Sequence, residues 1–251
     1  MCGRFTYKFS WQEFHDRLKV FVNGLDYIGE GVENHPPRFN IAPTQPIIVI
    51  SQVNGRHKAS LMRWGLVPNW VKDPSKFALI INARMETILE KPSFRGSVRH
   101  HRCLIPASGY YEWCAGTDGK KQPFYITGQD GKPIVFAGVF SNWMGPDGEE
   151  VDTTAIITMP SSPDLKKIHN RMPAIIPEEM MADWLNVARV NERDAMAMLR
   201  AAPSGTYRIH PVSTRVNSNR NEGEDLAQPI TLHEPVTDHA TRKKSGQQEL
   251  F

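Results

Sequence analysis

The sequence predicts an α+β protein, rich in β-strands, in which curved and mostly antiparallel sheets build a barrel-like single domain with a few peripheral helices. Two observations support this prediction. Short runs of β-branched and aromatic residues occupy residues 46–160 and are separated by turn sequences such as NG and QDGK, a pattern typical of hairpins. Helical spacing of apolar residues occurs only before and after this stretch, which places the helices at the margins.

A short amphipathic helix is expected near the N-terminus. It would begin after Ser10, a favourable N-cap residue, and bury four apolar side chains at helical spacing: Trp11, Phe14, Leu18 and Phe21. Residues 29–46 are rich in Gly, Pro and Asn, so we expect an irregular loop there.

The strands and the later helices follow in order. Seven segments have strand composition: residues 46–50, 58–68, 77–84, 102–113, 122–128, 133–143 and 153–160. Helices are predicted within 177–187 and 191–203, the second capped by Asn191 and followed by Pro203. Residues 206–213 and 228–232 have strand-like composition and would close the fold.

The amino-acid composition indicates what class of protein this is. The chain has 251 residues, 40% hydrophobic and 23% charged, with a net charge of +3, which is typical of a globular protein and not of a polybasic one. No apolar run approaches the ~20 residues of a membrane span, and the start lacks an apolar signal region. We therefore expect a cytoplasmic monomer, folded over residues 2–232, with a disordered polar tail over 233–251.

Three cysteines are too few and too scattered for a disulfide framework, so Cys103 and Cys114 are expected to be buried thiols. Cys2 differs because Met1 is normally removed before a small residue, which leaves a 1,2-aminothiol at the N-terminus. The amine of such a pair condenses with an aldehyde to a Schiff base, and the thiolate then closes a thiazolidine ring. Position alone favours an ordinary early cysteine, and the motifs described next favour the aminothiol.

Six motifs place the chain in a family. They are MCGRF, RFNIAPTQ at 38–45, RWGLVPNW at 63–70, INARMET at 81–87, RCLIPASGYYEW at 102–113 and IHNRMPAII at 168–176. Together, and in this order, they resemble the SRAP family of SOS-response-associated, abasic-site-processing proteins over about residues 1–230. The resemblance implies covalent capture of abasic sites in single-stranded DNA, with an associated lyase activity, in the DNA damage response, and hence a nucleoid-associated protein.

The resemblance also implies an active site. Its catalytic residues map onto Cys2, Asn82, Glu112 and His169. Aromatic neighbours of Glu112 favour a carboxyl that can exchange protons, and a histidine such as His169 is a residue type suited to a proton shuttle. Asn82 could orient the sugar oxygens without acting as a base. Without the family, a solvent-facing glutamate, a hydrogen-bonded loop histidine and an ordinary strand-end asparagine are the simpler interpretations.

DNA contacts are expected beside these residues. Arg4, Arg84 and Arg171 flank the catalytic positions in sequence and suit phosphate oxygens. The basic segment 95–102 could follow the DNA backbone or form a solvated loop. Three tryptophans could stack on bases, although core packing is the alternative for each: Trp64, Trp70 and Trp113.

Two rival functions use the same residues. A cysteine peptidase would use the Cys2 thiol with His169 as base, including self-cleavage of Met1 or of a short leader. A non-enzymatic DNA-binding module would leave Cys2, Glu112 and His169 without a role. No metal or cofactor is expected, because no HExxH motif or cysteine-histidine ligand cluster occurs.

The C-terminal residues predict a partner. QQELF at 247–251 resembles the peptide by which bacterial repair proteins dock on the replication sliding clamp, with Gln247, Leu250 and Phe251 as its contacts. An apolar Leu-Phe pair at the end of a polar tail suits a groove on another protein. A fortuitous terminus is the alternative.

Overall fold

A closed ring of five strands forms the centre of the protein. The structure is a computed structural model and describes residues 2–18, 27–116 and 119–232. Neighbours in the ring are paired in the order β5, β4, β7, β10, β11 and back to β5. The ring closes because Thr153 and Thr154 of β11 pair in parallel with Arg63 and Trp64 of β5. The five strands are β4 Pro46–Val53, β5 Arg56–Trp64, β7 Arg102–Ala107, β10 Ile134–Met144 and β11 Glu150–Pro160. The predicted barrel-like α+β fold is confirmed.

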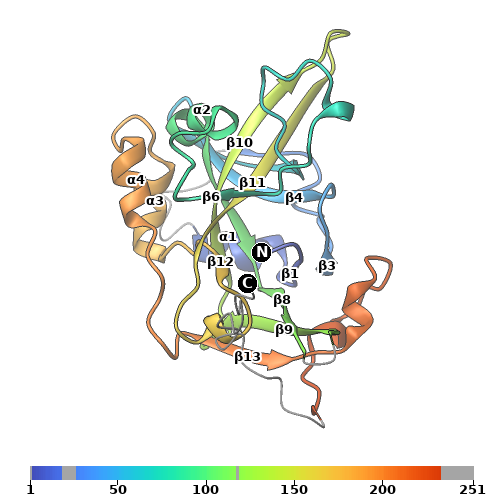
Figure 1. Ribbon diagram of the computed structural model, residues 1–251. Coiled ribbons are helices and arrows are strands. Elements are labelled where there is room, and N and C mark those ends of the chain that lie inside the picture. Colours follow the sequence, from blue (N-terminus) through green and yellow to red (C-terminus); the bar gives the residue numbers. More distant parts are fainter. Residues whose placement is uncertain (1, 19–26, 117–118, 233–251) are drawn as a thin grey trace, which may run out of the picture.

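Strand β11 carries two further strands at its C-terminal end. On one edge β6, Asn82–Arg84, runs parallel to it, and β12, Arg171–Pro173, pairs antiparallel to it. The residues that follow β11 therefore emerge between two short strands, as Figure 1 shows near the middle of the molecule. A last short strand, β2 Tyr27–Ile28, runs parallel to β5.

A second sheet of five strands lies below the ring in Figure 1. Its order is β13 Tyr207–Pro211, β9 Lys121–Gly128, β8 Gly109–Ala115, β1 Phe5–Tyr7 and β3 Arg38–Ile41. The segment 102–113, predicted as one strand-like stretch, crosses at Ser108 from the ring into this sheet. The phenyl group of Phe5, in the second sheet, packs against two aromatic side chains of the strand ring. The distance between ring centroids is 5.2 Å from Phe5 to Trp64 and 5.8 Å from Phe5 to Phe136.

Three sequence predictions for this part of the chain are wrong in detail. Residues 29–46 are not wholly irregular, because β3 lies within them and supplies the sheet edge beside β1. Only the last three residues of 77–84 form a strand, and 228–232 form none. In each case a long-range pairing partner, which local composition does not specify, decides the outcome.

The helices lie around the sheets, and their bounds are α1 Trp11–Leu18, α2 Pro92–His100, α3 Met181–Leu185 and α4 Glu192–Met198. Helix α1 begins as predicted: Ser10 Oγ accepts from Glu13 N at 3.2 Å while Glu13 Oε2 accepts from Ser10 N at 2.8 Å, a capping box. The predicted cap of α4 is confirmed, since Asn191 accepts from two backbone amides. Phe21 lies outside the described residues.

Helix α2 was not predicted, since its sequence was interpreted as a basic segment. Only Phe94 and Val98, four residues apart, bury apolar side chains from it. Its Arg95 and Arg99 are exposed, but Arg102 directly after the helix is fully buried and cannot follow a DNA backbone. The basic segment is therefore helical up to His100, and its last arginine, Arg102, is the first residue of β7 and belongs to the core.

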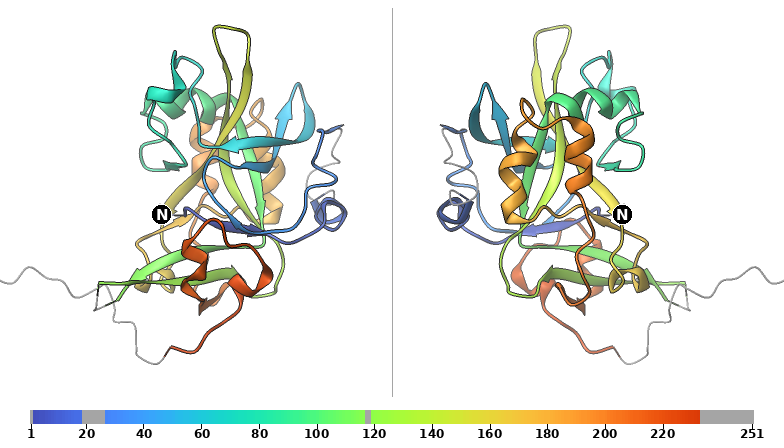
Figure 2. Two further views of the ribbon diagram at one scale, coloured as in Figure 1. Left: turned by 90° about the vertical axis from the view of Figure 1, so that its right-hand side faces the viewer. Right: turned by 90° about the vertical axis from the view of Figure 1, so that its left-hand side faces the viewer.

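Figure 2 shows the hairpin of β10 and β11 projecting beyond the ring. Helix α3 packs against β7, and helix α2 packs against β10. Cys103 and Cys114 are buried thiols, as expected. Within the described ranges, no helix is both long and apolar enough to cross a membrane. Residues 233–251, and with them the predicted clamp-binding Gln247, Leu250 and Phe251, lie outside the described part of the chain.

Candidate functional site

The pairing of β1 with β8 places the N-terminus. Phe5 of β1 lies opposite Tyr110 of β8, and the two strands are antiparallel. Residues before Phe5 therefore run alongside residues after Tyr110, so that Cys2 approaches Glu112. Both side chains are buried, Cys2 completely and Glu112 with 4% of its surface exposed.

The thiol of Cys2 is in an environment that disfavours its charge. Burial raises the pKa of the Cys2 thiol above its ordinary value, and the negative charge of Glu112 raises it further. Glu112 Oε1 also accepts a 3.3 Å hydrogen bond from the backbone amide of Trp113. The Cys2 thiol is thus protonated at neutral pH in the folded protein.

Asn82 holds the N-terminal segment from the opposite side. It is the first residue of β6 and pairs with Ile156 of β11. Its Nδ2 donates a 2.9 Å hydrogen bond to the carbonyl oxygen of Cys2. Its Oδ1 is buried, and no group in the described ranges donates to it. The amide therefore fixes Cys2 with its donor and keeps an acceptor at the same place.

His169 lies in the loop between β11 and β12. Its Nδ1 accepts a 3.0 Å hydrogen bond from the backbone amide of Arg171, which fixes the orientation of the ring. The same loop packs against β8, where Cys114 Sγ lies 3.5 Å from the carbonyl oxygen of Lys167. Cys114 shares a face of β8 with Glu112, because alternate residues of a strand point to the same side.

The guanidinium of Arg171 is bound by neighbouring residues of the protein. It forms a two-point ion pair with Glu86, with N–O distances of 2.6 and 3.0 Å. It also donates to the carbonyl oxygen of Thr158 at 2.6 Å. The hydrogen bond from Arg171 holds the pKa of Glu86 below its usual range.

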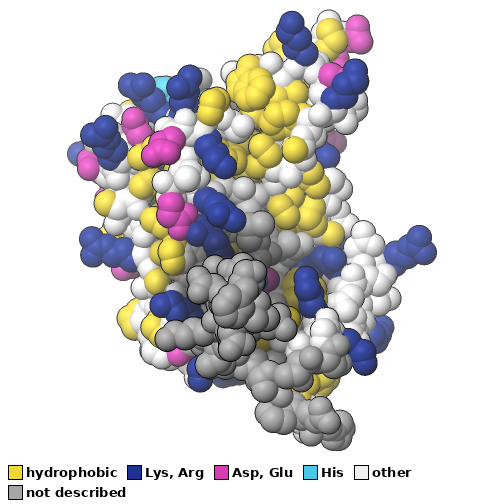
Figure 3. All heavy atoms as spheres, viewed as in Figure 1, with side chains coloured by type: hydrophobic (Ala, Val, Ile, Leu, Met, Phe, Trp, Pro, Cys, Tyr) yellow, Lys and Arg dark blue, Asp and Glu magenta, His cyan; other side chains and the backbone are white. Residues whose placement is uncertain are grey.

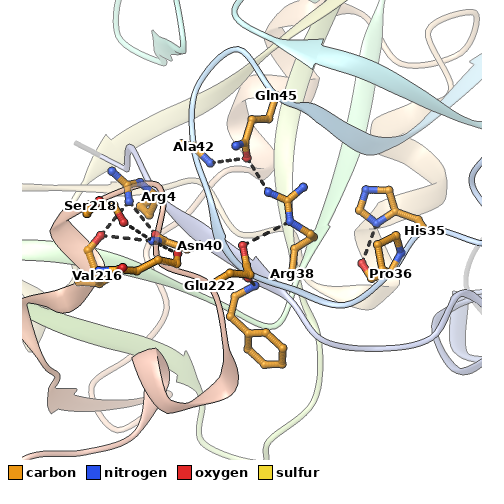
Figure 4. A network of polar contacts seen from close by, with 12 residues as sticks. Arg4, His35, Pro36, Arg38, Asn40, Ala42, Gln45, Val216, Ser218 and Glu222 are labelled. Carbon is orange, nitrogen blue, oxygen red and sulfur yellow. Dashed lines mark hydrogen bonds and ion pairs between the residues drawn. The ribbon is translucent and has the colours of Figure 1, made fainter.

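Arg4 is likewise engaged within the protein. One of its terminal nitrogens donates to Asn40 Oδ1 at 2.6 Å and to the carbonyl oxygen of Val216 at 2.8 Å (Figure 4). Burial lowers the pKa of the Arg4 guanidinium. Arg84, by contrast, is exposed beside the site. Of the three predicted phosphate-binding arginines, Arg84 is therefore the one whose side chain faces solvent.

The three tryptophans differ in exposure. Trp64 has no exposed surface and its Nε1 donates to the carbonyl oxygen of Ile81, so the prediction that it stacks on a base is wrong: it belongs to the core. Trp113 is partly buried and its Nε1 donates to Asn217 Oδ1 at 2.8 Å. Trp70 is 55% exposed and contacts Phe77 edge to face.

The surface around Trp70 combines apolar and basic groups. Figure 3 shows hydrophobic side chains gathered over the upper part of the molecule. Among the described residues, Trp70, Leu79 and Met144 are large hydrophobic side chains that are exposed. A hollow of about 640 Å³ lies beside Trp70 and is also lined by Arg95 and His100 of α2. Base stacking and phosphate contact are both chemically possible on such a surface.

Comparison with known proteins supplies the decisive observation. A family model described as SOS response associated peptidase (SRAP) matches residues 1–219. The chain belongs to the SRAP family. This confirms the resemblance found in the sequence motifs.

Curated SRAP relatives cover most of the chain. The abasic site processing protein YoqW of Bacillus subtilis is 36% identical over 226 residues, which are 90% of this chain and 98% of YoqW. The abasic site processing protein HMCES of Gallus gallus is 39% identical over 204 residues, 72% of this chain and 60% of HMCES. The fold is shared with a crystal structure from Bacteroides thetaiotaomicron at a TM-score of 0.78 and 24% identity, covering 92% of this chain and all of that one.

The site of this SRAP protein includes a residue that the sequence reasoning missed. Tyr110 lies on the same face of β8 as Glu112, two residues away, and its hydroxyl is buried without a partner among the residues described. Burial holds the pKa of Tyr110 well above its ordinary value, and Cys2 adds to this effect. The two-residue spacing from Glu112 was the available signal. In the described part of this SRAP chain, no group of three or more His, Cys, Asp or Glu side chains could hold a metal ion.

Proposed function

We propose that this protein processes abasic sites in DNA, and that it does so by capturing the abasic aldehyde in single-stranded DNA as a thiazolidine on Cys2. Both curated relatives described above are named abasic site processing proteins, which supports the broader statement. Capture as a thiazolidine is supported by the placement of Cys2. Its carbonyl oxygen accepts a hydrogen bond from Asn82, and its thiol lies close enough to Glu112 to interact with that charge.

The reaction balances without a cofactor. After removal of Met1, the amine of Cys2 adds to the C1 aldehyde of the ring-opened deoxyribose, and the carbinolamine loses water to give an imine. The thiol sulfur then bonds to the same carbon, and the thiol proton ends on the nitrogen. One water is released for each adduct.

The electrostatics suit this order of events. A thiol that burial and Glu112 keep protonated is a poor first nucleophile, so the amine attacks first. Glu112 takes a proton from the amine nitrogen as it adds to the aldehyde and gives this proton to the departing hydroxyl. It then accepts the thiol proton and passes it to the nitrogen. His169 exchanges a proton with the imine nitrogen or the sugar. The imine also acidifies the neighbouring sugar carbon, which allows strand cleavage as the associated lyase activity.

The test is a gel assay with purified protein and an abasic single-stranded oligonucleotide. The wild-type protein should give a heat-stable shifted band. Cys2→Ser and Cys2→Ala should give at most a borohydride-trappable imine, and a variant that retains Met1 should give no adduct. A stable adduct at wild-type yield from any of these variants would refute thiazolidine capture.

Glu112→Gln and His169→Ala test the proton-transfer roles in the same assay. Each should slow capture by about 10²- to 10⁴-fold, the usual contribution of general acid-base catalysis. Affinity for intact single strands should stay near wild type. Loss of binding with unchanged chemistry would contradict these roles.

The rival function is suggested by the family description, which names a peptidase. A cysteine peptidase needs the Cys2 thiol as acyl nucleophile and does not need its amine. A variant with a blocked N-terminal amine separates the two functions: it should lose DNA capture, and peptide hydrolysis that persists would support the peptidase.

We also propose that residues 247–251, QQELF, dock on a bacterial sliding clamp. The support is the sequence alone, since these residues lie outside the described part of the chain. Such docking would bring the protein to replication forks, where abasic sites are exposed in single strands.

A further inference from the structure

Asn40 of β3 joins three segments of the chain. It has no exposed surface, and all its side-chain polar atoms are used. Its Oδ1 accepts from Arg4 at 2.6 Å, while its Nδ2 donates to the carbonyl oxygens of Ser218 at 2.9 Å and Asn221 at 2.8 Å (Figure 4). A third, longer contact of 3.5 Å reaches the carbonyl oxygen of Val216.

Residues 212–222, which we call the C-terminal strap, lie on the side of the sheet away from Cys2. Val216 of the strap packs in a cluster with Tyr111 of β8, and Asn217 accepts from Trp113. Tyr111 and Trp113 alternate with Tyr110 and Glu112 along β8, so they point to the opposite face of the sheet. The strap therefore cannot touch the thiol directly.

Arg4 connects the strap to the reactive end of the chain. Its backbone carbonyl accepts a 2.9 Å hydrogen bond from Tyr111, which keeps the N-terminal segment on β8. Its guanidinium donates to Asn40 of β3, the strand paired with β1, and to the carbonyl oxygen of Val216. Cys2 is two residues away, so the Arg4 side chain anchors the segment that carries it.

We propose that Asn40 is a positioning residue, which holds Arg4 and the strap together so that Cys2 is kept buried against Glu112. Only a carboxamide can accept from a guanidinium and donate to carbonyl oxygens from one planar group, as this arrangement requires. The positioning itself does not depend on the reaction, whereas its effect on rate rests on the proposed function.

The first test measures the reactivity of the Cys2 thiol without DNA. Iodoacetamide alkylation is followed by peptide mass spectrometry, which reports Cys2, Cys103 and Cys114 separately. Asn40→Ala should raise the alkylation rate of Cys2 about tenfold, because the segment opens more easily once a buried hydrogen-bonding group is removed. The rates at Cys103 and Cys114 should stay unchanged.

Two further variants make the test specific. Asn40→Asp keeps the acceptor for Arg4 and loses the donors to the strap, so Cys2 alkylation should rise by less than in Asn40→Ala. Glu222→Gln is the matched control, because the glutamine oxygen still accepts from the backbone amide of Phe39, so only the ion pair with Arg38 is lost and Arg4 and Asn40 stay paired. It should leave Cys2 alkylation at the wild-type rate.

The second test separates rate from binding. In single-turnover capture of an abasic oligonucleotide, Asn40→Ala should lower the rate at saturating DNA by about 10- to 100-fold, the usual effect of a misplaced reactive group. The half-saturating DNA concentration should stay within about twofold, since Asn40 is buried and the Arg4 guanidinium that it binds is engaged within the protein.

The outcomes distinguish the two proposals. Unchanged Cys2 alkylation in folded Asn40→Ala, or an equal rise at all three cysteines, overturns the positioning role. Absence of capture by the wild-type protein overturns the proposed function and leaves the alkylation test intact. If Asn40→Ala does not fold, Arg4→Met removes the same hydrogen bond from the other side and should give the same selective rise at Cys2.

Discussion

The side-chain amide of Asn82 donates a 2.9 Å hydrogen bond to the carbonyl oxygen of Cys2. This bond links the N-terminal segment to the first residue of β6, which pairs with β11 of the strand ring. Strand β1 attaches the same segment to β8 of the second sheet. Cys2, the proposed nucleophile, is thus held from both sheets at once.

Asn82→Ala is expected to lower the rate of capture at saturating DNA by about 10- to 100-fold, because the reacting atoms lose their alignment. The free energy of unfolding should fall by only about 1 kcal/mol, the net value of one hydrogen bond. Single-turnover kinetics and urea denaturation measure the two effects. A rate loss that merely matched the unfolded fraction would argue against a role in alignment.

Glu112→Gln should lower the pKa of the Cys2 thiol, because the charge of Glu112 contributes to raising it. The thiolate fraction at a fixed pH then increases about tenfold for each pKa unit lost. The pH profile of Cys2 alkylation checks this, and its midpoint should move to lower pH in the variant. An unmoved midpoint would mean that burial alone sets the thiol pKa.

The same raised pKa predicts a stability change with pH. A thiol whose pKa is higher when folded contributes stability below its unfolded pKa of about 8.5, and this contribution is lost as pH rises above that value. Urea midpoints of the wild type should therefore fall more steeply between pH 8 and 10 than those of Cys2→Ser.

Arg84→Ala should affect DNA binding alone, whereas Arg171→Ala should also lower the stability of the fold. Arg84 is exposed, so its loss should weaken DNA binding most at low salt and reduce the salt slope by about 1. Arg171 is bound to Glu86 and Thr158, so its loss should also cost about 1–3 kcal/mol of stability. Fluorescence anisotropy over a salt series, paired with thermal denaturation, tests both. Identical behaviour of the two variants would contradict the distinction.

Arg102→Met should strongly destabilise the fold. The buried guanidinium donates to four backbone carbonyls that close the ends of α2 and α3: Val98, Trp184, Asn186 and Val190. Removing it leaves buried acceptors without donors, and we expect a loss of about 3–5 kcal/mol in urea denaturation. The exposed neighbour Arg99 provides the control, since Arg99→Met should change stability by less than about 0.5 kcal/mol.

A peptide of residues 240–251 should bind a purified bacterial sliding clamp. Burial of Leu250 and Phe251 would contribute about 3–6 kcal/mol before ordering costs, enough for a weak to moderate contact. Fluorescence anisotropy with the peptide, and with both residues changed to alanine, measures it. Equal affinity of the two peptides would discard the motif without affecting the chemistry at Cys2.

Turns and helix caps could be predicted from the sequence, because a few adjacent residues specify them. Asn54 and Gly55 form the turn between β4 and β5 with φ values of 51° and 76°, as an NG pair in a tight hairpin requires. The N-caps of α1 and α4, Ser10 and Asn191, were also predicted correctly from the sequence. Helix α2 was not, because two apolar residues are too few to show a helical period.

The sequence by itself determined which chemical groups this protein carries: the thiol of Cys2, a carboxyl among aromatic residues, an amide and a histidine. Tertiary structure alone decided which of them meet, because the register of β1 on β8 brings Cys2 to Glu112 across 110 positions in the chain. It also decided that Trp64 is buried while Trp70 is exposed, and that Arg171 is paired while Arg84 faces solvent. Burial and pairing depend on which distant strands lie alongside, and residue type and spacing do not encode that.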